Sequence, residues 1–447
     1  MRQALSSVVE RNTEACGTAP ASSGCPHPSS FAHNVVQTFA TRLVLLGTGL
    51  LTAILVARAL GPAGRGLYAV AVAIGAIGVQ LGNLGLHASN TYYVAQDRSI
   101  LPSLIGNSLL VSFLLGAVAT GATWIVLLQW PGLAPVQGTL LGLALLWVPV
   151  GLAYLLLQNL LLGVLEVSKY NQIELLTKIL ALVLLGIVIA KPGAHVETVF
   201  LTGLVALAVG FVWVLLRLLR MATRAPWPDA CLLRGHVGLG FRAYLAAFFA
   251  FLVLRIDLLL VKYLLGTADA GYYSIAATMA DSIVILPTVV ASLLFPRLSG
   301  MADGTRKWSL ARKTAVLTGL TMLPVVLVAS ALAKPVVRMF FGPAFMPAVP
   351  AFVWLLPGIF FLGIETVLVQ FLNSMGFPKI VVGGWCICCV ANIALNLWAI
   401  PAYGIVGASV VSSICYILIC IVVTLISVRG SYLRPPLLSD QISVMPT

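Results

Sequence analysis

The chain has 447 residues, of which 60% are hydrophobic and only 9% are charged. Soluble globular domains carry roughly 25% charged residues, so water is not the main solvent of this protein. Apolar stretches of about 20 residues, the length of one helical membrane crossing, recur along almost the whole chain. The short connections between them leave no room for a soluble catalytic domain. Because the first thirty residues contain no apolar core, we expect no cleaved secretory signal peptide.

The apolar stretches predict an all-α integral membrane protein with about twelve transmembrane helices. In chain order, the expected helices lie at 35–57, 67–90, 104–128, 139–163, 172–190, 196–218, 240–263, 270–295, 312–333, 348–373, 378–400 and 404–428. The expected domains are a disordered tail at 1–34, a six-helix lobe at 35–218, a linker at 219–238, a second six-helix lobe at 239–428 and a tail at 429–447.

The 26 Lys and Arg residues are distributed unevenly among the connections. The tails and every second connection, with the adjoining helix ends, hold 18 of them, whereas the opposite connections hold six. Positively charged loops stay in the cytoplasm during membrane insertion, so we expect both termini on the cytoplasmic side of the membrane. Topology thus explains the net charge of +13 without a nucleic-acid partner. Anionic lipid headgroups would meet these loops.

Cysteine spacing gives no sign of a metal site or a cofactor. Cys386, Cys388 and Cys389 form a cluster within one apolar stretch, but neither a histidine nor a second cysteine pair lies at ligand spacing. Cys16 and Cys25 lie in the N-terminal tail. We expect free thiols in the membrane, where they pack between helices.

The chain contains an internal repeat. Residues 55–71 (LVARALGPAGRGLYAVA) and 260–276 (LVKYLLGTADAGYYSIA) align at a constant offset of 205, with eight identities in seventeen positions. Each copy falls between the first and second expected helices of one lobe. Two lobes of six crossings each have the same orientation, which is typical of a parallel-repeat transporter. The alternative is a glycine turn found twice by chance, in which one Gly ends a helix and another lets the next begin close to it.

At these residues the chain resembles the polysaccharide biosynthesis branch, with its O-antigen-type oligosaccharide flippases, of the superfamily that also holds MATE multidrug exporters and lipid II flippases. The resemblance covers nearly all of 35–428. It is carried by the order of ARALGPAGRGLYAV, RIDLLLVKYLLGTADAGYYSIA, LFPRLS at 294–299, FFGPAF at 340–345 and IPAYGIVGAS at 400–409. It implies two lobes around a central cavity that opens alternately to each side, and a cargo such as an undecaprenyl-diphosphate-linked oligosaccharide. It fixes no catalytic residue.

Ionisable side chains at membrane depth are costly, so they usually face a cavity or a partner. Those expected within helices include Arg42, Arg255, Asp257, Asp281 and Glu365. The two arginines are suited to binding a diphosphate through forked, charge-assisted hydrogen bonds. The alternative for them is interhelical pairing, such as Arg255 with Asp281. The three acids are candidates for ion coupling.

Polar side chains also form stripes on expected helices. Gln80, Asn83, His87 and Asn90 are spaced by three, four and three residues, which places them on one face of a continuous helix. A second stripe comprises Thr366, Gln370 and Asn373. We interpret these stripes as walls of a cavity that binds a sugar headgroup. The alternative is hydrogen bonding between packed helices.

Together with the resemblance, these features predict a flippase of the bacterial inner membrane for a lipid-linked oligosaccharide, working in O-antigen, capsule or exopolysaccharide assembly. Other assembly proteins are candidate partners. Enzymatic activity is not expected, because extended loops with clustered acids or histidines and a Walker motif are missing from the sequence. Two alternatives stay open at this point. One is a MATE-like drug or cation antiporter, and the other is a membrane enzyme or scaffold of the same glycan pathway.

Overall fold

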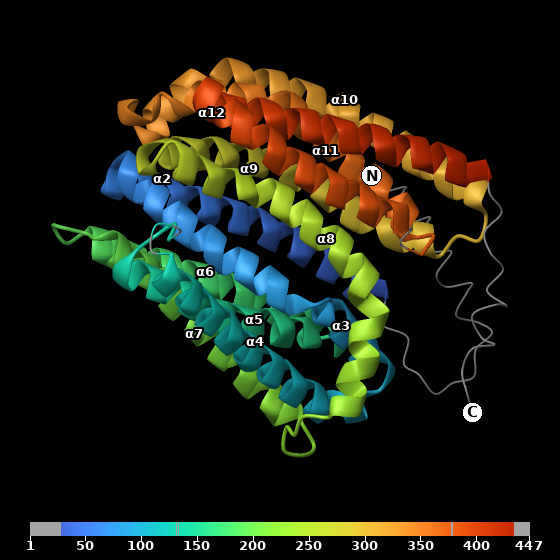
Figure 1. Ribbon diagram of the computed structural model, residues 1–447. Coiled ribbons are helices and arrows are strands. Elements are labelled where there is room, and N and C mark those ends of the chain that lie inside the picture. The colour runs from blue at the N-terminus through green and yellow to red at the C-terminus, as the bar shows by residue number, and fades with distance from the viewer. Residues whose placement is uncertain (1–27, 131, 133, 377–378, 433–447) are drawn as a thin grey trace.

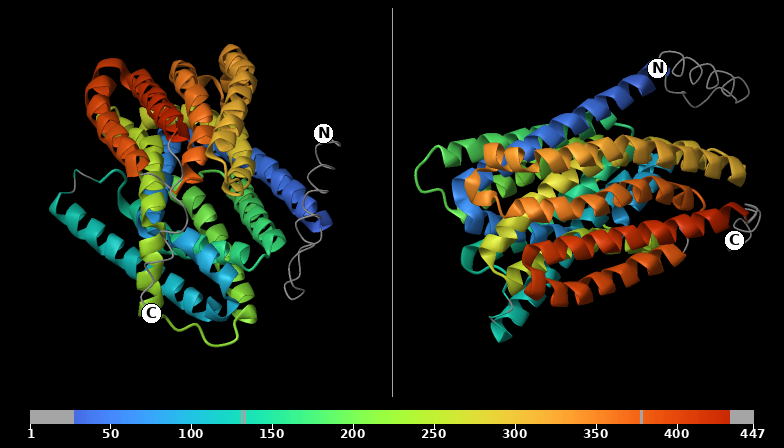
Figure 2. Two further views of the ribbon diagram at one scale, coloured as in Figure 1. Left: turned by 90° about the vertical axis from the view of Figure 1, so that its right-hand side faces the viewer. Right: turned by 90° about the horizontal axis from the view of Figure 1, so that it is seen from above.

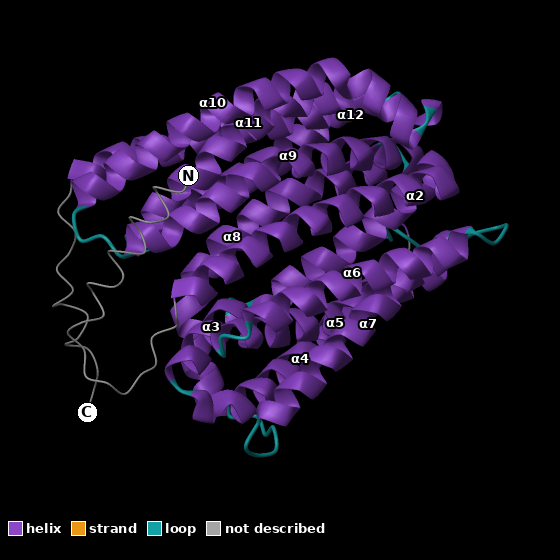
Figure 3. Cartoon of the chain, turned by 180° about the vertical axis from the view of Figure 1, so that it is seen from behind, coloured by secondary structure: helices purple, strands orange, loops and turns teal. Residues whose placement is uncertain are grey.

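The computed structural model describes residues 28–432, apart from 131, 133, 377 and 378, and in these residues it contains helices and no strand (Figure 3). The N-terminal tail before residue 28, with Cys16 and Cys25, and most of the C-terminal tail lie outside the described residues. The elements are α2 (Pro28–Asn83), α3 (Leu86–Gln96), η1 (Arg98–Ile100), α4 (Leu101–Gln129), α5 (Gly138–Gly163), α6 (Val167–Ile189), α7 (Val196–Met221), α8 (Ala230–Leu264), α9 (Thr267–Ser299), α10 (Gly304–Val336), η3 (Val337–Phe341), η4 (Pro343–Phe345), α11 (Ala348–Asn373) and α12 (Lys379–Tyr432).

Ten helices among the described residues are long and apolar enough to cross a membrane. Two of them, α2 and α12, each contain two crossings, because Gly61 and Gly404 interrupt them with non-helical backbone. Both glycines have positive φ, at 65° and 63°, which a residue with a Cβ rarely adopts. The expected all-α membrane fold of about twelve helices is therefore confirmed.

One expected helix, 67–90, is wrong at its C-terminal end. The helix ends at Asn83, and α3 begins at Leu86. Leu84 and Gly85 between them have φ values of 47° and 80°, which break the helical path. The side chains before and after this break therefore do not share one helical face.

The helices form two groups, α2–α7 and α8–α12 (Figure 1). The groups meet at the end of the bundle where α8 connects to α9 and where α2, just beyond Gly61, lies against α9, just beyond Gly266. We call this end the turn end. The groups diverge toward the opposite end, which holds the connections 222–229 and 300–303 and which we call the basic end (Figure 1). Figure 2 shows the bundle from two further sides. The second half of α2 packs against α9. The N-terminal part of α8 also contacts the first group, where the Tyr244 hydroxyl donates to the Leu81 carbonyl oxygen of α2 at 3.0 Å.

The internal repeat has a structural counterpart at the turn end. Gly61 and Gly266 occupy equivalent repeat positions, and both combine positive φ with extended ψ, at −176° and −173°. Beyond these turns, Gly66 of α2 and Gly271 of α9 lie directly against each other. A Cβ on Gly66 would lie 1.9 Å from the Thr267 carbonyl oxygen, and a Cβ on Gly271 would lie 2.0 Å from that of Pro62. We call this backbone-to-backbone contact the seam.

Adding a methyl group at the seam tests how tightly it holds the groups together. We expect Gly66→Ala or Gly271→Ala to lower the thermal unfolding midpoint of the purified protein, because overpacking costs about 1–3 kcal/mol. Gly49→Ala, on the same helix as Gly66, is the matched control, since a Cβ there has no heavy atom within 4 Å. Equal midpoints for the wild type and both seam variants would show that the groups are not in close contact there.

Candidate functional site

Arg42 and Arg255 each form an ion pair between two helices. The Nη1 group of Arg42 in α2 donates to Oε1 of Glu174 in α6 at 2.9 Å. Arg255 in α8 lies with its Nη2 2.9 Å from Oδ2 of Asp281 in α9. The interhelical pairing of Arg255 with Asp281 is thus present. The acid beside Arg42 comes from a segment 132 residues away, which no local spacing could reveal.

Neither pair is sealed in the protein interior. The side chains of Arg42 and Arg255 retain 41% and 36% of their exposure. A guanidinium has five N–H donors in a fixed plane, so a carboxylate that takes one or two of them leaves others for a second anion. Each group of helices therefore presents an arginine that is held by one acid and stays accessible.

The two arginines lie at different depths. At 1.5 Å per helical residue, Arg42 lies about 28 Å along α2 from Gly61 at the turn end. By the same rise, Arg255 lies roughly 16 Å along α8 from Gly266. Arg42 is thus near the basic end, and Arg255 is near the middle of the bundle.

Asp257 is part of a polar cluster inside the second group. Its side chain is only 1% exposed and accepts hydrogen bonds from the Tyr273 hydroxyl at 3.0 Å and from Asn396 Nδ2 at 2.9 Å. The Ser412 hydroxyl also donates to it. Asn396 bonds Asn392 at 3.2 Å, yet Asn392 Nδ2 and Asn396 Oδ1 are buried without a partner among the described residues. The cluster joins α8, α9 and α12.

The three candidate acids have three different surroundings. Asp257 accepts several hydrogen bonds, and Asp281 pairs with Arg255. Glu365 in α11 is buried, and its Oε1 has no partner in the described part of the chain. They do not form one acidic site. Among the described residues, moreover, no three His, Cys, Asp or Glu side chains are grouped so as to hold a metal ion.

The polar stripe of Gln80, Asn83, His87 and Asn90 is divided by the break at Leu84 and Gly85. Asn83 Oδ1 accepts the backbone N–H of His87 at 3.2 Å, and its amide nitrogen lies 2.7 Å from the His87 ring nitrogen Nδ1. Asn90 is buried and donates to Ser108 Oγ of α4 at 2.9 Å. Asn83 and Asn90 therefore hold the helix break and α4 in place, whereas Gln80 and His87 stay partly exposed.

The stripe on α11 bonds mainly to itself. Gln370 Nε2 donates to the Thr366 carbonyl oxygen at 3.2 Å, and Asn373 Nδ2 lies 3.5 Å from Gln370 Oε1. Both amides are partly exposed. They retain hydrogen-bonding capacity for a further ligand.

Arg65 was not among the candidate residues, because it falls between the expected helices 35–57 and 67–90. Arg65 lies in α2 at the seam and is 6% exposed. Its Nε donates to Ser274 Oγ at 3.2 Å and its Nη2 to Thr278 Oγ1 at 3.3 Å, both in α9. The signal in the sequence was a mismatch in the repeat, since the equivalent position in the second copy is Ala270.

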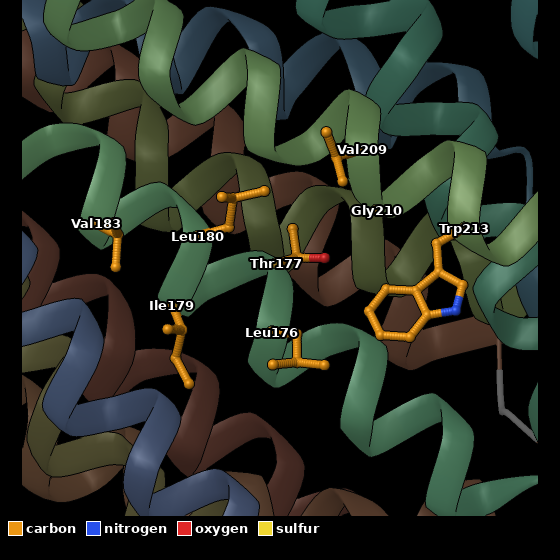
Figure 4. A pocket seen from close by; sticks show the side chains of 8 residues that line it. All are labelled: Leu176, Thr177, Ile179, Leu180, Val183, Val209, Gly210 and Trp213. Carbon is orange, nitrogen blue, oxygen red and sulfur yellow. The ribbon is translucent and has the colours of Figure 1, made fainter.

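A groove of about 320 Å³ lies on the outer surface of the first group, between α6 and α7 (Figure 4). Its lining is Leu176, Thr177, Ile179, Leu180, Val183, Val209, Gly210 and Trp213. Leu176, Val183 and Trp213 are exposed, so the groove faces the surroundings of the bundle. Without a charged side chain, it offers no site for an anionic headgroup.

Comparison with known proteins assigns the chain to a family. Residues 55–350, about two thirds of the chain, match the family of polysaccharide biosynthesis proteins. A Shigella flexneri protein named as a candidate O-antigen transporter is 26% identical over 163 residues, which cover 36% of this chain and 39% of that protein. A Haloferax volcanii protein named as a candidate flippase, AglR, is 28% identical over 164 residues, which cover 35% of this chain and 34% of that protein. The aligned part thus spans well under half of either relative.

Solved structures share the fold at low sequence identity. An inward-facing MATE-family multidrug resistance transporter aligns with a TM-score of 0.66 and 16% identity, over 91% of this chain and 96% of that one. The lipid II flippase MurJ, in an inward closed conformation, also aligns with a TM-score of 0.66 and 16% identity, over 89% of this chain and 87% of that one. The chain is therefore a multi-pass membrane protein with a MATE-like fold, and it belongs to the family of polysaccharide biosynthesis proteins.

Proposed function

We propose that the protein is a flippase for a lipid-diphosphate-linked oligosaccharide of the undecaprenyl-diphosphate type. It moves this cargo from the inner to the outer leaflet of the bacterial cytoplasmic membrane by alternating access between two six-helix lobes. The observation that supports the proposal most is the placement of Arg42 and Arg255. Each helix group holds one of them, and each arginine is paired with one acid of its own group and remains accessible. Family membership supports a role in polysaccharide assembly.

A diphosphate can take over the donors of these arginines. Arginine binds phosphate oxygens through two parallel, charge-assisted hydrogen bonds. In the empty protein, Glu174 and Asp281 balance the two cations, which keeps the cost of a charge at membrane depth low. A diphosphate at Arg42 or Arg255 would provide the same balance.

The partly exposed amides suit the sugar part of the cargo. Gln80, His87, Gln370 and Asn373 offer neutral donors and acceptors for sugar hydroxyls. Asn83 and Asn90 act behind this wall, where they hold the break before α3 and its contact with α4. Such a lining would accept varied sugars, because neutral amides bind many hydroxyl arrangements.

The charge of the connections supports the direction of transport. The basic end carries Arg224 in the connection 222–229 and Arg306 in the first turn of α10, and positively charged loops remain in the cytoplasm. With this orientation both termini are cytoplasmic, the divergent end of the bundle faces the inner leaflet, and the seam closes the outer side. Anionic lipids and other polysaccharide-assembly proteins are the expected neighbours.

Replacing the arginines tests the proposal directly. In vesicles with purified protein and a fluorescent undecaprenyl-diphosphate-linked oligosaccharide, we expect Arg42→Ala or Arg255→Ala to slow flipping about tenfold or more, and Lys to retain part of it. A hydrogen bond to a charged group contributes about 1.5–3 kcal/mol. Arg306→Ala is the control, since Arg306 is 85% exposed beside Asp303.

Removing the acids separates the functional role from a structural one. Glu174→Gln and Asp281→Asn leave the arginines in place, so transport should persist, whereas a purely structural ion pair would fail equally when either partner is lost. Wild-type flipping by both Ala variants would eliminate diphosphate binding at these residues.

The membrane potential supplies a driving force that can be tested next. Each elementary charge that crosses the membrane is worth about 2.3 kcal/mol per 100 mV. A diphosphate carries roughly two negative charges, so its outward movement would gain up to about 4.6 kcal/mol at a potential of about 100 mV. We expect flipping to rise with a valinomycin-set potential that is positive on the receiving side, without any Na⁺ or H⁺ gradient. Indifference to voltage, with strict dependence on one of those gradients, would contradict this mechanism.

Asp257 is the acid best placed to couple an ion to transport. It joins three helices of one group, and its neighbours Asn392 and Asn396 have unused polar atoms. If a Na⁺ or H⁺ gradient accelerates flipping, we expect Asp257→Asn to abolish that acceleration and leave the response to voltage. Glu365→Gln is the comparison at a buried acid outside the cluster. Unchanged acceleration in Asp257→Asn would remove Asp257 from this role.

A further inference from the structure

Arg65 is a buried cation in the contact between the two helix groups. Its guanidinium reaches from α2 to the hydroxyls of Ser274 and Thr278 in α9, at 3.2 and 3.3 Å. Its Cζ lies 5.6 Å from the centroid of the Tyr68 ring in its own helix. Each of these partners is neutral.

The charge of Arg65 is balanced less well than the charges of Arg42 and Arg255. Arg42 and Arg255 each contact a carboxylate at 2.9 Å. In the described part of the chain, no carboxylate lies within ion-pair distance of Arg65. An uncompensated charge away from water is costly, and hydroxyls at more than 3 Å offset only part of that cost. The seam therefore encloses the charged side chain of Arg65 without a carboxylate to neutralise it.

The backbones of α2 and α9 lie too close at the seam for an anion to enter between them. Next to Arg65, even a single added Cβ on Gly66 would lie 1.9 Å from the Thr267 carbonyl oxygen. Separation of α2 from α9 would change this. Arg65 would move away with α2, while Ser274 and Thr278 would remain on α9. The donors of Arg65 would then lose their acceptors and face the opening.

We propose that Arg65 is the binding site for the diphosphate headgroup in the state that opens at the turn end. This inference rests on the proposed function and adds a residue and a state to it. Arg65 lies four residues beyond Gly61, about 6 Å along the helix. Arg42, Arg255 and Arg65 thus offer successive anion sites at decreasing distance from the turn end. The third becomes available only when the seam separates.

A site at Arg65 also requires the headgroup to be released before the seam closes. A diphosphate at Arg65 occupies space between α2 and α9, and the seam closes only when the backbones at Gly66 and Gly271 are in contact. The bound headgroup therefore prevents closure. Once it leaves, Ser274 and Thr278 again accept the hydrogen bonds of Arg65.

The experiment uses the full-length protein and inorganic pyrophosphate as the probe. Phenylglyoxal modifies accessible arginines, and peptide mass spectrometry gives the rate at Arg65. Gly271→Leu serves as a wedge that holds the seam apart, with Gly271→Ala as a smaller wedge should the leucine variant not give a monodisperse protein. Arg306, exposed at the basic end, is the internal control.

We expect Arg65 to react slowly in the wild type and at least tenfold faster in the wedge variant. Pyrophosphate at constant ionic strength should slow that reaction at least fivefold, and should leave Arg306 unaffected. Fast labelling that pyrophosphate does not slow would overturn the inference and leave Arg65 as a structural contact of the seam. Labelling that stays slow in both wedge variants would overturn it as well.

Flipping in vesicles separates this inference from the proposed function. Arg65→Gln should lose most transport and Arg65→Lys should retain part, while cargo binding at the basic end persists in both. If the wild type flips the lipid-linked oligosaccharide and Arg65→Gln matches it, the site at Arg65 is refuted and the proposed function stands. If the wild type does not flip this cargo, the proposed function itself fails, whatever pyrophosphate does at Arg65.

Discussion

The contact of two backbones at Gly66 and Gly271 is the constraint on which the rest of the arrangement depends. Lipid tails are as apolar as leucine, so helices in a membrane gain little from hydrophobic burial and associate through close packing and hydrogen bonds. Glycine provides the closest approach. This contact sets the separation of the two groups at the turn end and encloses Arg65 between them. The groups diverge toward the basic end (Figure 1), where the N-terminal part of α8 still contacts α2.

The polar residues in this bundle differ in how much of their hydrogen-bonding capacity is already used. Asn83 and Asn90 are buried and bonded to neighbouring groups, so they stabilise the fold near the start of α3. Arg42 and Arg255 are paired but accessible. Arg65 is buried with neutral partners. A ligand gains most where the protein leaves donors unfilled, which is why the arginines, rather than the asparagines, support the proposed transport of an anion.

Much of the fold could be predicted from the sequence, because long apolar stretches and glycine turns are local signals. The repeat around Gly61 and Gly266 also marked where the two groups meet. The break at Leu84 was not predicted, because the polar spacing of three, four and three residues suggests a continuous helix. A leucine with positive φ is uncommon and has no local signal. The pair of Arg42 with Glu174 depends on the packing of distant segments. Arg65 looked like a loop residue, because hydropathy places it beside a turn.

The same seam that closes the turn end gives the proposed cycle its direction. With Arg42 and Arg255 neutralised by acids of their own groups, the empty protein can change state without moving an unbalanced charge at either pair. The loaded protein carries the negative charge of the cargo, and a potential that is negative inside favours its outward movement. Arg65 adds a further restriction, because its hydroxyl partners on α9 and a bound anion exclude each other. In the proposed cycle, the site at Arg65 must therefore be vacated before the glycines can meet again, so cargo released there would not return as the two helix groups close.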